Sequence, residues 1–377
     1  MLSIIILPNA CDWSGSVIHA QLPDGVLQEM PEQIRAVLAE AREVEFATIS
    51  ARGVPVNNPL FHYYGPTGTT IDVATGVAYP AKADRARRNP RVGLLFAPGI
   101  AAQDPVVKGS LPGQVSTEGT AAVPPGDRPV VVICATASVR DSDIQANTDR
   151  YVRDFLRDHP LRVPWEQDRE RVWYYARIYV ECTPRRVLFW PAGASGGAAP
   201  VVWEAPPQWQ ARPSDPAPAS RGARREEWPA SPWRASATAV LADIPIPTLT
   251  VIDADGYPLP FPTTGARITD EGFELSLPGR LPWSPAGPAC LTFAVSATFL
   301  GTVRHSAAQT TFTVDRLVGN LPLSGNRLLP GTSPQAKKIL VGRLAEQLEL
   351  RNQPVPEVRL VADGAAAPGT PERTART

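Results

Sequence analysis

Apolar and polar positions alternate along much of the stretch from Glu45 to Phe96, and glycine and proline turns interrupt them. Three runs rich in β-branched and aromatic residues predict strands: EFATIS, VPVNNPLFHYY and TIDVA. Turns between them fall at Arg52-Gly53 and at Gly65-Pro66-Thr67-Gly68. A basic helix, PAKADRARRNP, follows, and the apolar run VGLLF predicts a fourth strand. The stretch therefore predicts a strand-rich unit with one helix before its fourth strand.

The flanking segments extend this pattern. PEQIRAVLAEAREV predicts a helix, with Pro31 suited to its first turn. After a Gly/Pro-rich loop come two strand candidates, QVSTEGTAAV and PVVVICATASV. NTDRYVRDFLRDHP predicts a short helix capped by Asn147 or Thr148. RVWYYARIYVECTPRRVLFW predicts two β segments separated at Thr183-Pro184, which completes a domain over residues 31–190 after an arm at 1–30.

Residues 237–330 repeat the pattern of the first domain. TLTVIDADGYPLPFPTTGARITDEGFELSLPG follows the same order of strands and turns as TISARGVPVNNPLFHYYGPTGTTIDVATG. Three turn residues recur at one offset of 203 positions (256 − 53, 258 − 55 and 279 − 76): Gly53/Gly256, Pro55/Pro258 and Gly76/Gly279. One shared offset indicates an internal duplication. The second copy lacks the basic helix, and Pro285 falls at the position of Lys82.

The remaining segments read as connections and a C-terminal extension. Residues 191–236 are rich in Pro, Ala, Gly and Arg, which is typical of a linker. Parts of this linker should pack against the domains, because it carries four tryptophans: Trp203, Trp209, Trp228 and Trp233. SPQAKKILVGRLAEQLELR predicts a helix within an extension at 331–361, and residues 362–377 have the composition of a disordered tail.

Composition limits the classes of partner. The chain has 377 residues, enough for two domains or three. Basic and acidic residues both number 37, so the net charge of zero gives no general attraction to nucleic acid or an anionic membrane. Any anion-binding site must therefore be local.

Cysteines and histidines are scattered, without the spacing of metal ligands, so we expect no metal site. The apolar start MLSIIILP lacks the basic region of a signal peptide. No run approaches the roughly 20 apolar residues that a membrane span needs. These features together predict a cytoplasmic protein with reduced thiols and no membrane partner.

A local anion site is predicted at the start of the basic helix. Helix N-termini carry unpaired N–H groups and a partial positive charge, and Lys82 lies in the first turn. Thr75 and Tyr79 can add hydroxyl donors, while Asn57 and Asn58 can hydrogen-bond a planar heterocycle. The alternative is a solvated surface helix, since charged helix faces are common.

The ordered series ATISARGVPVNNPLFHY, IDVATG, PAKADRARRNPRVGLLF and ARIYVECTPRRVLFW resembles the FMN-binding split-barrel family of pyridoxamine 5′-phosphate oxidase-like proteins. The likeness covers most of residues 31–190 and recurs more weakly over 237–320. It implies an all-β protein with a few flanking helices, built as two tandem FMN-binding split β-barrels that form a pseudo-dimer. It also implies FMN as cofactor, with F420 as the alternative. The cofactor-binding residues that it implies are Asn57, Asn58, Pro59, Leu60, Ala74, Thr75 and, on the phosphate, Lys82.

Two departures from the family narrow the implied activity. Pro80 stands where the family often has a serine, which removes one phosphate donor. The Arg-Leu-His-Asp-Arg type segment of the true oxidases is absent, which argues against pyridoxamine phosphate oxidation. The resemblance then implies flavin-dependent oxidoreduction of a small organic substrate, with a nicotinamide coenzyme as one candidate electron donor. Flavin binding without turnover is the alternative.

The missing lysine in the second copy predicts one flavin per chain, bound between two barrels of the same molecule. A further homodimer is left open. A remote alternative is a serine hydrolase, because Gly193–Gly197 matches G-x-S-x-G around Ser195, and Asp243, Asp253 and His305 follow in hydrolase order. A nucleophile elbow must lead into a helix, however, and a linker follows here.

Overall fold

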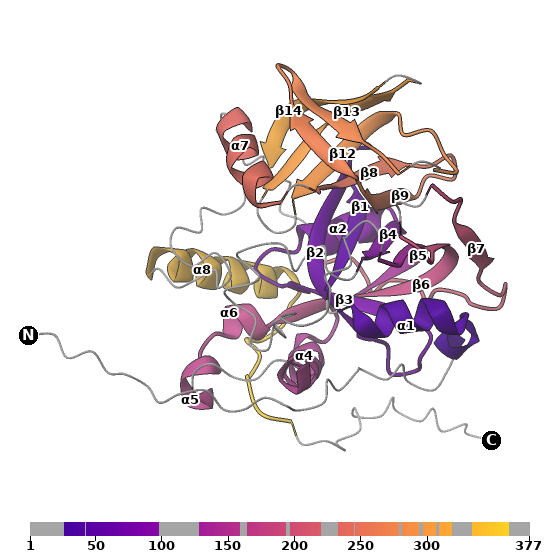
Figure 1. Cartoon of the computed structure of the whole chain (residues 1–377). Coiled ribbons are helices and arrows are strands. Elements are labelled where there is room, and N and C mark those ends of the chain that lie inside the picture. Colours follow the sequence, from indigo (N-terminus) through magenta and orange to yellow (C-terminus); the bar gives the residue numbers. More distant parts are fainter. Residues whose placement is uncertain are drawn as a thin grey trace, which may run out of the picture.

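A computed structural model describes residues 26–41, 43–97, 128–158, 164–193, 197–219, 233–244, 246–278, 281–293, 297–306, 309–318 and 334–361. Several features predicted from the sequence lie outside these residues: most of the N-terminal arm, the strand QVSTEGTAAV, Ser195, Trp228, Gly279 and the tail at 362–377. Figure 1 shows two groups of strands, one above the other, with helices around the lower group.

The first unit is a closed six-stranded antiparallel barrel. Its strands are β1 (Glu43–Ile49), β2 (Pro55–Tyr64), β3 (Ile71–Gly76), β4 (Arg91–Phe96), β5 (Val130–Arg140) and β6 (Arg177–Trp190). They follow the order β3-β2-β1-β4-β5-β6, and β3 also pairs with β6, which closes the barrel. A short strand, β7 (Val201–Glu204), continues the sheet beyond β6. The prediction of a mainly β fold is confirmed.

Helices cover the outside and one end of this barrel. They are η1 (Val26–Glu29), α1 (Glu32–Glu40), α2 (Ala81–Arg88), α4 (Ile144–Asp158), α5 (Trp165–Asp168) and α6 (Val172–Tyr175). The cap predicted for α4 is wrong. Asp143 accepts a hydrogen bond from the N–H of Ala146 at 2.9 Å, and Thr148 lies inside the helix, where its hydroxyl donates to the carbonyl of Ile144.

The prediction of two closing β segments is also wrong. β6 is one continuous strand, and the VWYY sequence before it forms α6. Pro184 lies opposite Ala135 and Arg186 lies opposite Cys134, so Arg185 is an extra, bulged residue. A bulge interrupts the regular ladder, which allows a strand to contain a proline without ending there.

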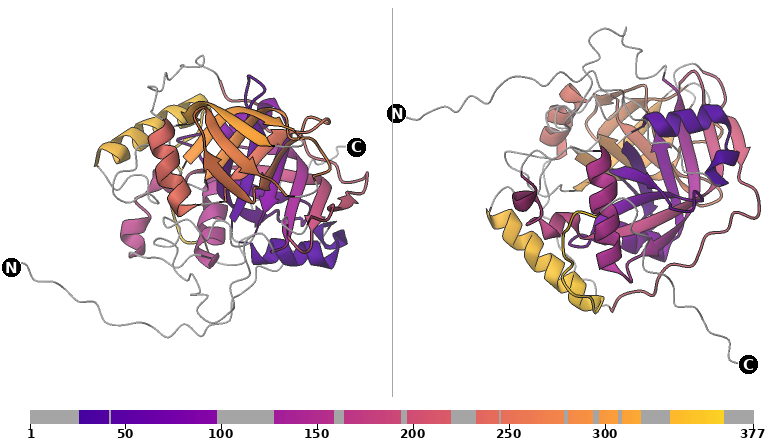
Figure 2. Two further views of the ribbon diagram at one scale, coloured as in Figure 1. Left: turned by 45° about the horizontal axis from the view of Figure 1, so that its top comes forward. Right: turned by 90° about the horizontal axis from the view of Figure 1, so that it is seen from below.

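The core of the first unit includes residues that come last in the sequence. Helix α8 (Pro334–Leu350) presents Leu340, Leu344 and Leu348, which are buried in the same apolar cluster as α1 and the barrel interior. Burial of a leucine side chain contributes roughly 1.5–3 kcal/mol. Figures 1 and 2 show α8 beside the first unit, although the second unit precedes it in the chain.

The second unit is a curled antiparallel sheet packed against α7 (Trp233–Asp243). Its strands are β8 (Thr248–Ile252), β9 (Pro258–Pro262), β10 (Gly265–Ile268), β11 (Gly272–Ser276), β12 (Gly287–Phe293), β13 (Ala297–His305) and β14 (Thr310–Val318). The order is β10-β11-β14-β13-β12-β8-β9. Figure 2 shows this sheet from a second direction. The described structure therefore contains two barrel-like units, the closed first barrel and this curled sheet.

Strands β9 and β10 correspond to the two halves of β2. Residues 55–61 of β2 pair with β1 and residues 62–64 pair with β3. In the second unit β9 pairs with β8, β10 pairs with β11, and only Thr263 and Thr264 separate the two strands. The strand orders of the units therefore agree when β9 and β10 are taken as one interrupted strand.

The offset of 203 residues holds at the level of hydrogen bonds. In the first turn, Ser50 N–H donates to Val54 O at 2.8 Å and Gly53 N–H donates to Ser50 O at 3.0 Å. The same bonds recur in the second unit, with distances of 2.9 and 3.1 Å, between Asp253, Gly256 and Tyr257. Gly53 and Gly256 both have positive φ, 74° and 81°, which favours glycine at each turn.

The contact between the units is reciprocal. β2 packs against β8, β12 and β13, while β9 packs against β1, β4 and β5. Because β8, β9, β12 and β13 hold the places of β1, β2, β4 and β5, each unit offers the same strands to the other. A contact in which both sides use equivalent surfaces has the form of a two-fold dimer interface.

Close backbone approach and ion pairs hold this contact. A Cβ atom on Gly93 would lie 1.9 Å from the carbonyl oxygen of Pro258, so only glycine fits there. Arg186 pairs with Asp253 at 2.5 Å and with Asp255 at 2.8 Å across the units.

Among the described segments, no helix combines the length and apolar character needed to cross a membrane.

Candidate functional site

Lys82 enters the fold through a tight turn between β3 and α2. Tyr79 N–H donates to Gly76 O at 3.0 Å, and the Tyr79 ring lies so close that a Cβ on Gly76 would be 2.6 Å from it. The Thr75 hydroxyl is 3.4 Å from Tyr79 O. Pro80 is the N-cap residue of α2 and supplies no side-chain cap. The start of α2 therefore keeps its N–H groups for another partner.

The amine of Lys82 has no counterion in the described structure. The side chain is half-buried, and neither a hydrogen bond nor an ion pair joins it to another described residue. Burial, with the positive charges of Arg85 and Arg177 nearby, lowers the pKa of Lys82 to about 8. An anion bound beside Lys82 would stabilise its charged form, so we expect an anion to bind there.

Arg85 connects α2 to the strands beneath it. Its Nε donates to the hydroxyl of Thr48 at 2.8 Å, and its Nη2 donates to Oδ1 of Asn58 at 3.3 Å. Burial lowers the pKa of Arg85 to about 10. The structure thus links Asn58, one of the predicted residues, to the helix that carries Lys82.

Arg177 is a candidate that the sequence reasoning missed. It starts β6 directly opposite Gly76, and only 7% of the residue is exposed. Its Nη2 donates to the hydroxyl of Tyr151 at 2.9 Å, and its guanidinium lies 4.2 and 4.5 Å from the ring centroids of Tyr151 and Tyr174. Its Nε is buried without a partner. The signal in the sequence is a single arginine that starts an apolar strand, ARIYV.

Buried tyrosines surround Arg177 and reach the end of β3. Tyr63, Tyr151 and Tyr179 form one apolar cluster with Ala74, another predicted residue. The hydroxyls of Tyr63 and Tyr179 are buried without partners. Burial raises the pKa of both tyrosines, so the hydroxyls are neutral donors at physiological pH. The edge beside Thr75 is therefore rich in hydrogen-bond donors that the protein leaves unused.

The predicted residues on β2 lie nearer to the second unit. Asn57 is fully buried, its Nδ2 donates to Oε2 of Glu45 at 2.7 Å, and its Oδ1 is buried without a partner. Its backbone N–H is hydrogen-bonded to the thiol of Cys290 in β12. Pro59 is half-buried and lies opposite Glu45, while Leu60 packs against the barrel core.

Glu45 is a second candidate that the sequence did not reveal. Burial, and next the charge of Glu43, raise the pKa of Glu45 to about 8, against the hydrogen bond from Asn57. The carboxyl is therefore protonated at neutral pH. A buried group with a pKa near the working pH can hold or release a proton for a neighbouring ligand.

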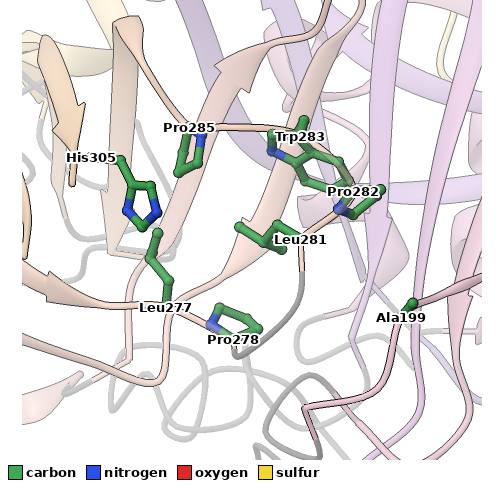
Figure 3. Close-up of a pocket in the computed structure, with 8 residues that line it drawn as sticks. All are labelled: Ala199, Leu277, Pro278, Leu281, Pro282, Trp283, Pro285 and His305. Atoms are coloured by element: carbon green, nitrogen blue, oxygen red, sulfur yellow. The ribbon is translucent and has the colours of Figure 1, made fainter. Parts of the chain in front are cut away.

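The structure thus brings Ala74, Thr75 and Lys82 to one edge of the barrel, next to Arg177. Asn58 joins them through Arg85, and Asn57 lies at the contact with the second unit. Whether the seven predicted residues line one site stays a prediction. None of them borders the cavity of about 380 Å³ in the second unit (Figure 3), whose wall contains Leu277, Leu281, Trp283 and His305.

Two residues of the hydrolase alternative, Asp253 and His305, have other partners, while Ser195 and the side chain of Asp243 lie outside the described structure. Asp253 pairs with Arg186 and accepts from the N–H of Tyr257 at 2.7 Å. His305 Nδ1 lies 2.7 Å from the hydroxyl of Thr310. Among the described residues there is also no group of three or more His, Cys, Asp and Glu side chains that could hold a metal ion.

No protein-family model matches the chain, and no curated protein matches it. Among solved structures, a conserved hypothetical protein from Mycobacterium tuberculosis is 20% identical over 43% of this chain and 86% of its own, with a TM-score of 0.30. A pyridoxamine 5′-phosphate oxidase-related, FMN-binding protein from Nostoc punctiforme is 15% identical over 41% and 81%, with a TM-score of 0.27. An F420 reductase is 14% identical over 42% and 97%, with a TM-score of 0.28. These values are too low to carry an activity over to this chain.

Proposed function

We propose that this chain binds a phosphorylated flavin, FMN or the deazaflavin F420, at its first unit and uses it to oxidise or reduce a small organic substrate. The observation that carries the proposal is the unpaired amine of Lys82 at the uncapped start of α2. Arg177, a second buried cation that pairs with no carboxylate among the described residues, supports it. Lys82 is the residue that holds the phosphate.

The donor set fits a phosphate group. A phosphate monoester carries a charge of about −1.5 to −2 at neutral pH and accepts several hydrogen bonds. The N–H groups at the start of α2, the Lys82 amine and the hydroxyl of Thr75 supply donors for it. A bound anion also restores the pKa of Lys82 toward its ordinary value, which makes binding stronger where the amine is protonated.

The residues toward β2 suit the ring of the cofactor. The unpaired Oδ1 of Asn57 can accept a hydrogen bond from a ring N–H, and Pro59, Leu60 and Ala74 provide apolar surface. When bound, the flavin supplies the two-electron chemistry. The chain's own residues fix the orientation of the cofactor and exclude water, and Glu45 holds a proton beside Asn57.

The reciprocal contact between the units supports a tandem assembly. We infer an internal pseudo-dimer in which the second unit completes the site that Lys82 begins. The second unit has Pro285 at the corresponding position, so it provides no second phosphate site, and each chain binds one flavin. A small-molecule substrate and a nicotinamide coenzyme are the proposed partners.

Titration of the apoprotein with FMN, followed by flavin fluorescence, tests this proposal. We expect one FMN per chain, and we expect Lys82→Met to weaken FMN about a hundred-fold, the size of a lost charge-assisted contact. Riboflavin, which lacks the phosphate, should be affected little by the same change. Arg88→Met, at an exposed position of the same helix, is the matched control.

Two results would contradict the proposal: two equivalent FMN sites per chain, or full FMN affinity in Lys82→Met. F420 titrated in parallel decides between the two cofactors. Anaerobic reduction of the bound flavin by NADH or NADPH, and its reoxidation by candidate acceptors, separates an enzyme from a flavin-binding protein without turnover. Flavin binding without turnover is the alternative function, and it predicts that neither NADH nor NADPH reduces the bound flavin.

A further inference from the structure

The cavity in the second unit borders the connection after β11, which is the counterpart of the connection after β3 that carries Lys82 in the first. Part of its wall consists of Leu277, Pro278 and Pro285. At the offset of 203 residues, their counterparts in the first unit are three predicted cofactor residues: Ala74, Thr75 and Lys82. The pairing of β10 with β11 repeats that of β2 with β3 at this offset, so Leu277 and Pro278 follow β11 as Ala74 and Thr75 follow Val73. By β12 the offset has fallen to 197 (290 − 93), so Pro285 corresponds to Lys82 by sequence count alone.

Three further lining residues come from the same connection as Pro285. Leu281, Pro282 and Trp283 lie between β11 and β12, where the first unit has the connection from β3 through α2 to β4. Ala199, from the segment after β6, and His305, at the end of β13, complete the wall. The connection after β11 thus borders a hollow, whereas the connection after β3 forms a basic helix.

The chemistry of this hollow differs from that of the Lys82 site. Leucine, proline, alanine and tryptophan side chains form most of its described wall, and none of the described lining residues is a lysine, arginine or carboxylate. A phosphate placed there would lose its hydration without gaining a cation among these residues. An uncharged ligand loses much less on entering an apolar wall.

Trp283 offers a defined ring surface and one polar contact. Edge contacts with Trp190, 6.3 Å between ring centroids, and with Phe261, 5.4 Å, hold its indole in place. Its Nε1 is buried and has no hydrogen-bond partner. Trp173, Trp190 and Trp209 also have a buried Nε1 without a partner, but of these four only Trp283 is among the described residues of the cavity wall, where a ligand can supply the acceptor.

His305 lies on the other side of the cavity. Figure 3 shows His305 and Leu277 on one side, Trp283 and Pro282 on the other, and Leu281 between them. The Nδ1 of His305 is engaged with the hydroxyl of Thr310 at 2.7 Å, which fixes the ring and leaves Nε2 for a ligand.

We propose that this cavity binds a small, uncharged, planar ring compound with a carbonyl oxygen as acceptor. The indole of Trp283 packs against the ring, and its N–H donates to the acceptor. The volume of about 380 Å³ lies at the lower end of the range for ligand pockets, which limits the ligand to a small ring system. This site does not depend on flavin binding in the first unit.

Equilibrium dialysis with lumichrome, an uncharged three-ring compound with two carbonyl groups, tests the proposal. We expect one molecule bound per chain when saturating FMN occupies the site proposed in the first unit, which would otherwise accept the same ring system. Ala199→Trp, a change at an exposed residue on the rim, should weaken binding more than tenfold because the new side chain fills the cavity. Trp283→Phe keeps an aromatic ring but removes the N–H, and should weaken binding about fivefold.

Lys82→Met is the matched variant in the first unit, and we expect it to leave lumichrome binding unchanged. Absence of lumichrome binding to the wild-type chain would overturn the proposal. So would binding that Ala199→Trp leaves intact, because the compound would then occupy another place. Thermal unfolding of each variant shows whether a loss of binding reflects the cavity or the fold. Failure of FMN to bind the same chain would overturn the function proposed for the first unit alone.

Discussion

The same place in the fold carries a cation in the first unit and prolines in the second. After β3, the first unit builds a helix with an unpaired Lys82; after β11, the second builds a stretch ending in Pro285 beside an apolar cavity. Strand order, pairing register and the first turn are nevertheless alike. The difference shows that the sheet fixes where a site lies, while the connection after one strand decides its chemistry.

Gly93→Ala tests whether the two units depend on their contact. The added methyl group would clash with the carbonyl oxygen of Pro258, and we expect a loss of about 3 kcal/mol in the free energy of unfolding. Urea denaturation measures this loss. Gly342→Ala is the control, because nothing lies near that helical glycine, and it should stabilise the protein by about 1 kcal/mol. Equal effects of the two changes would show that the contact is not close.

Glu45→Gln tests a buried acid that the second unit lacks, since Thr248 stands 203 residues later. The pKa of Glu45 is raised to about 8, so the folded protein keeps a proton that the unfolded chain loses near pH 4.5. Wild-type stability therefore falls as pH rises through this window, with a slope of about 1.4 kcal/mol per pH unit. Glutamine does not titrate, so the variant should gain about 2 kcal/mol over wild type between pH 5 and pH 6.5. Parallel pH dependences of unfolding in the two proteins would refute the raised pKa.

Arg177→Met tests whether the missed arginine belongs to the site of Lys82. If it does, the ratio of FMN to riboflavin affinity should fall about twentyfold, because only FMN carries the phosphate. Fluorescence titration with both ligands gives this ratio. Arg177→Lys keeps the positive charge and should therefore retain part of the preference for FMN over riboflavin. Equal weakening of FMN and riboflavin would instead assign Arg177 to the support of the tyrosine cluster.

The pH dependence of FMN binding gives the smallest expected effect. The pKa of Lys82 is about 8, and only the protonated amine attracts the phosphate, so affinity should fall about fivefold between pH 8 and pH 9. The phosphate itself does not titrate in this range. In Lys82→Met the affinity should be constant from pH 8 to pH 9. A fall of the same size in that variant would place the titrating group elsewhere.

Local pattern was sufficient for the strands and turns around Lys82. The three strand-forming runs of β1, β2 and β3, the turns at Gly53 and Gly68 and the start of α2 were all predicted, because each depends on neighbours in the sequence. The continuity of the closing strand β6 was not predicted, because its bulge at Arg185 arises from pairing with β5, which is distant in the sequence.

The buried ionisable groups were not predictable for the same reason. Glu45 and Arg177 lie in strand sequences that show no unusual pattern. Only the packed fold buries the carboxyl of Glu45 and leaves the Nε of Arg177 without a partner. Lys82 was predicted as a site residue, but its lowered pKa was not, because it follows mainly from burial in the packed fold and then from the nearby charges of Arg85 and Arg177. The cavity also required the fold, because Ala199 and His305 join its wall from separate segments.

The place of α8 has a consequence for the order of events during synthesis. The leucines at 340, 344 and 348 belong to the core of the first unit, yet they leave the ribosome after the whole second unit has been made. Val358, buried in the tyrosine cluster, follows later still. The core of the first barrel is therefore complete only after α8 and the segment that contains Val358 have been synthesised. A nascent chain stopped before residue 334 should expose that core to proteases, even though every barrel strand has been synthesised.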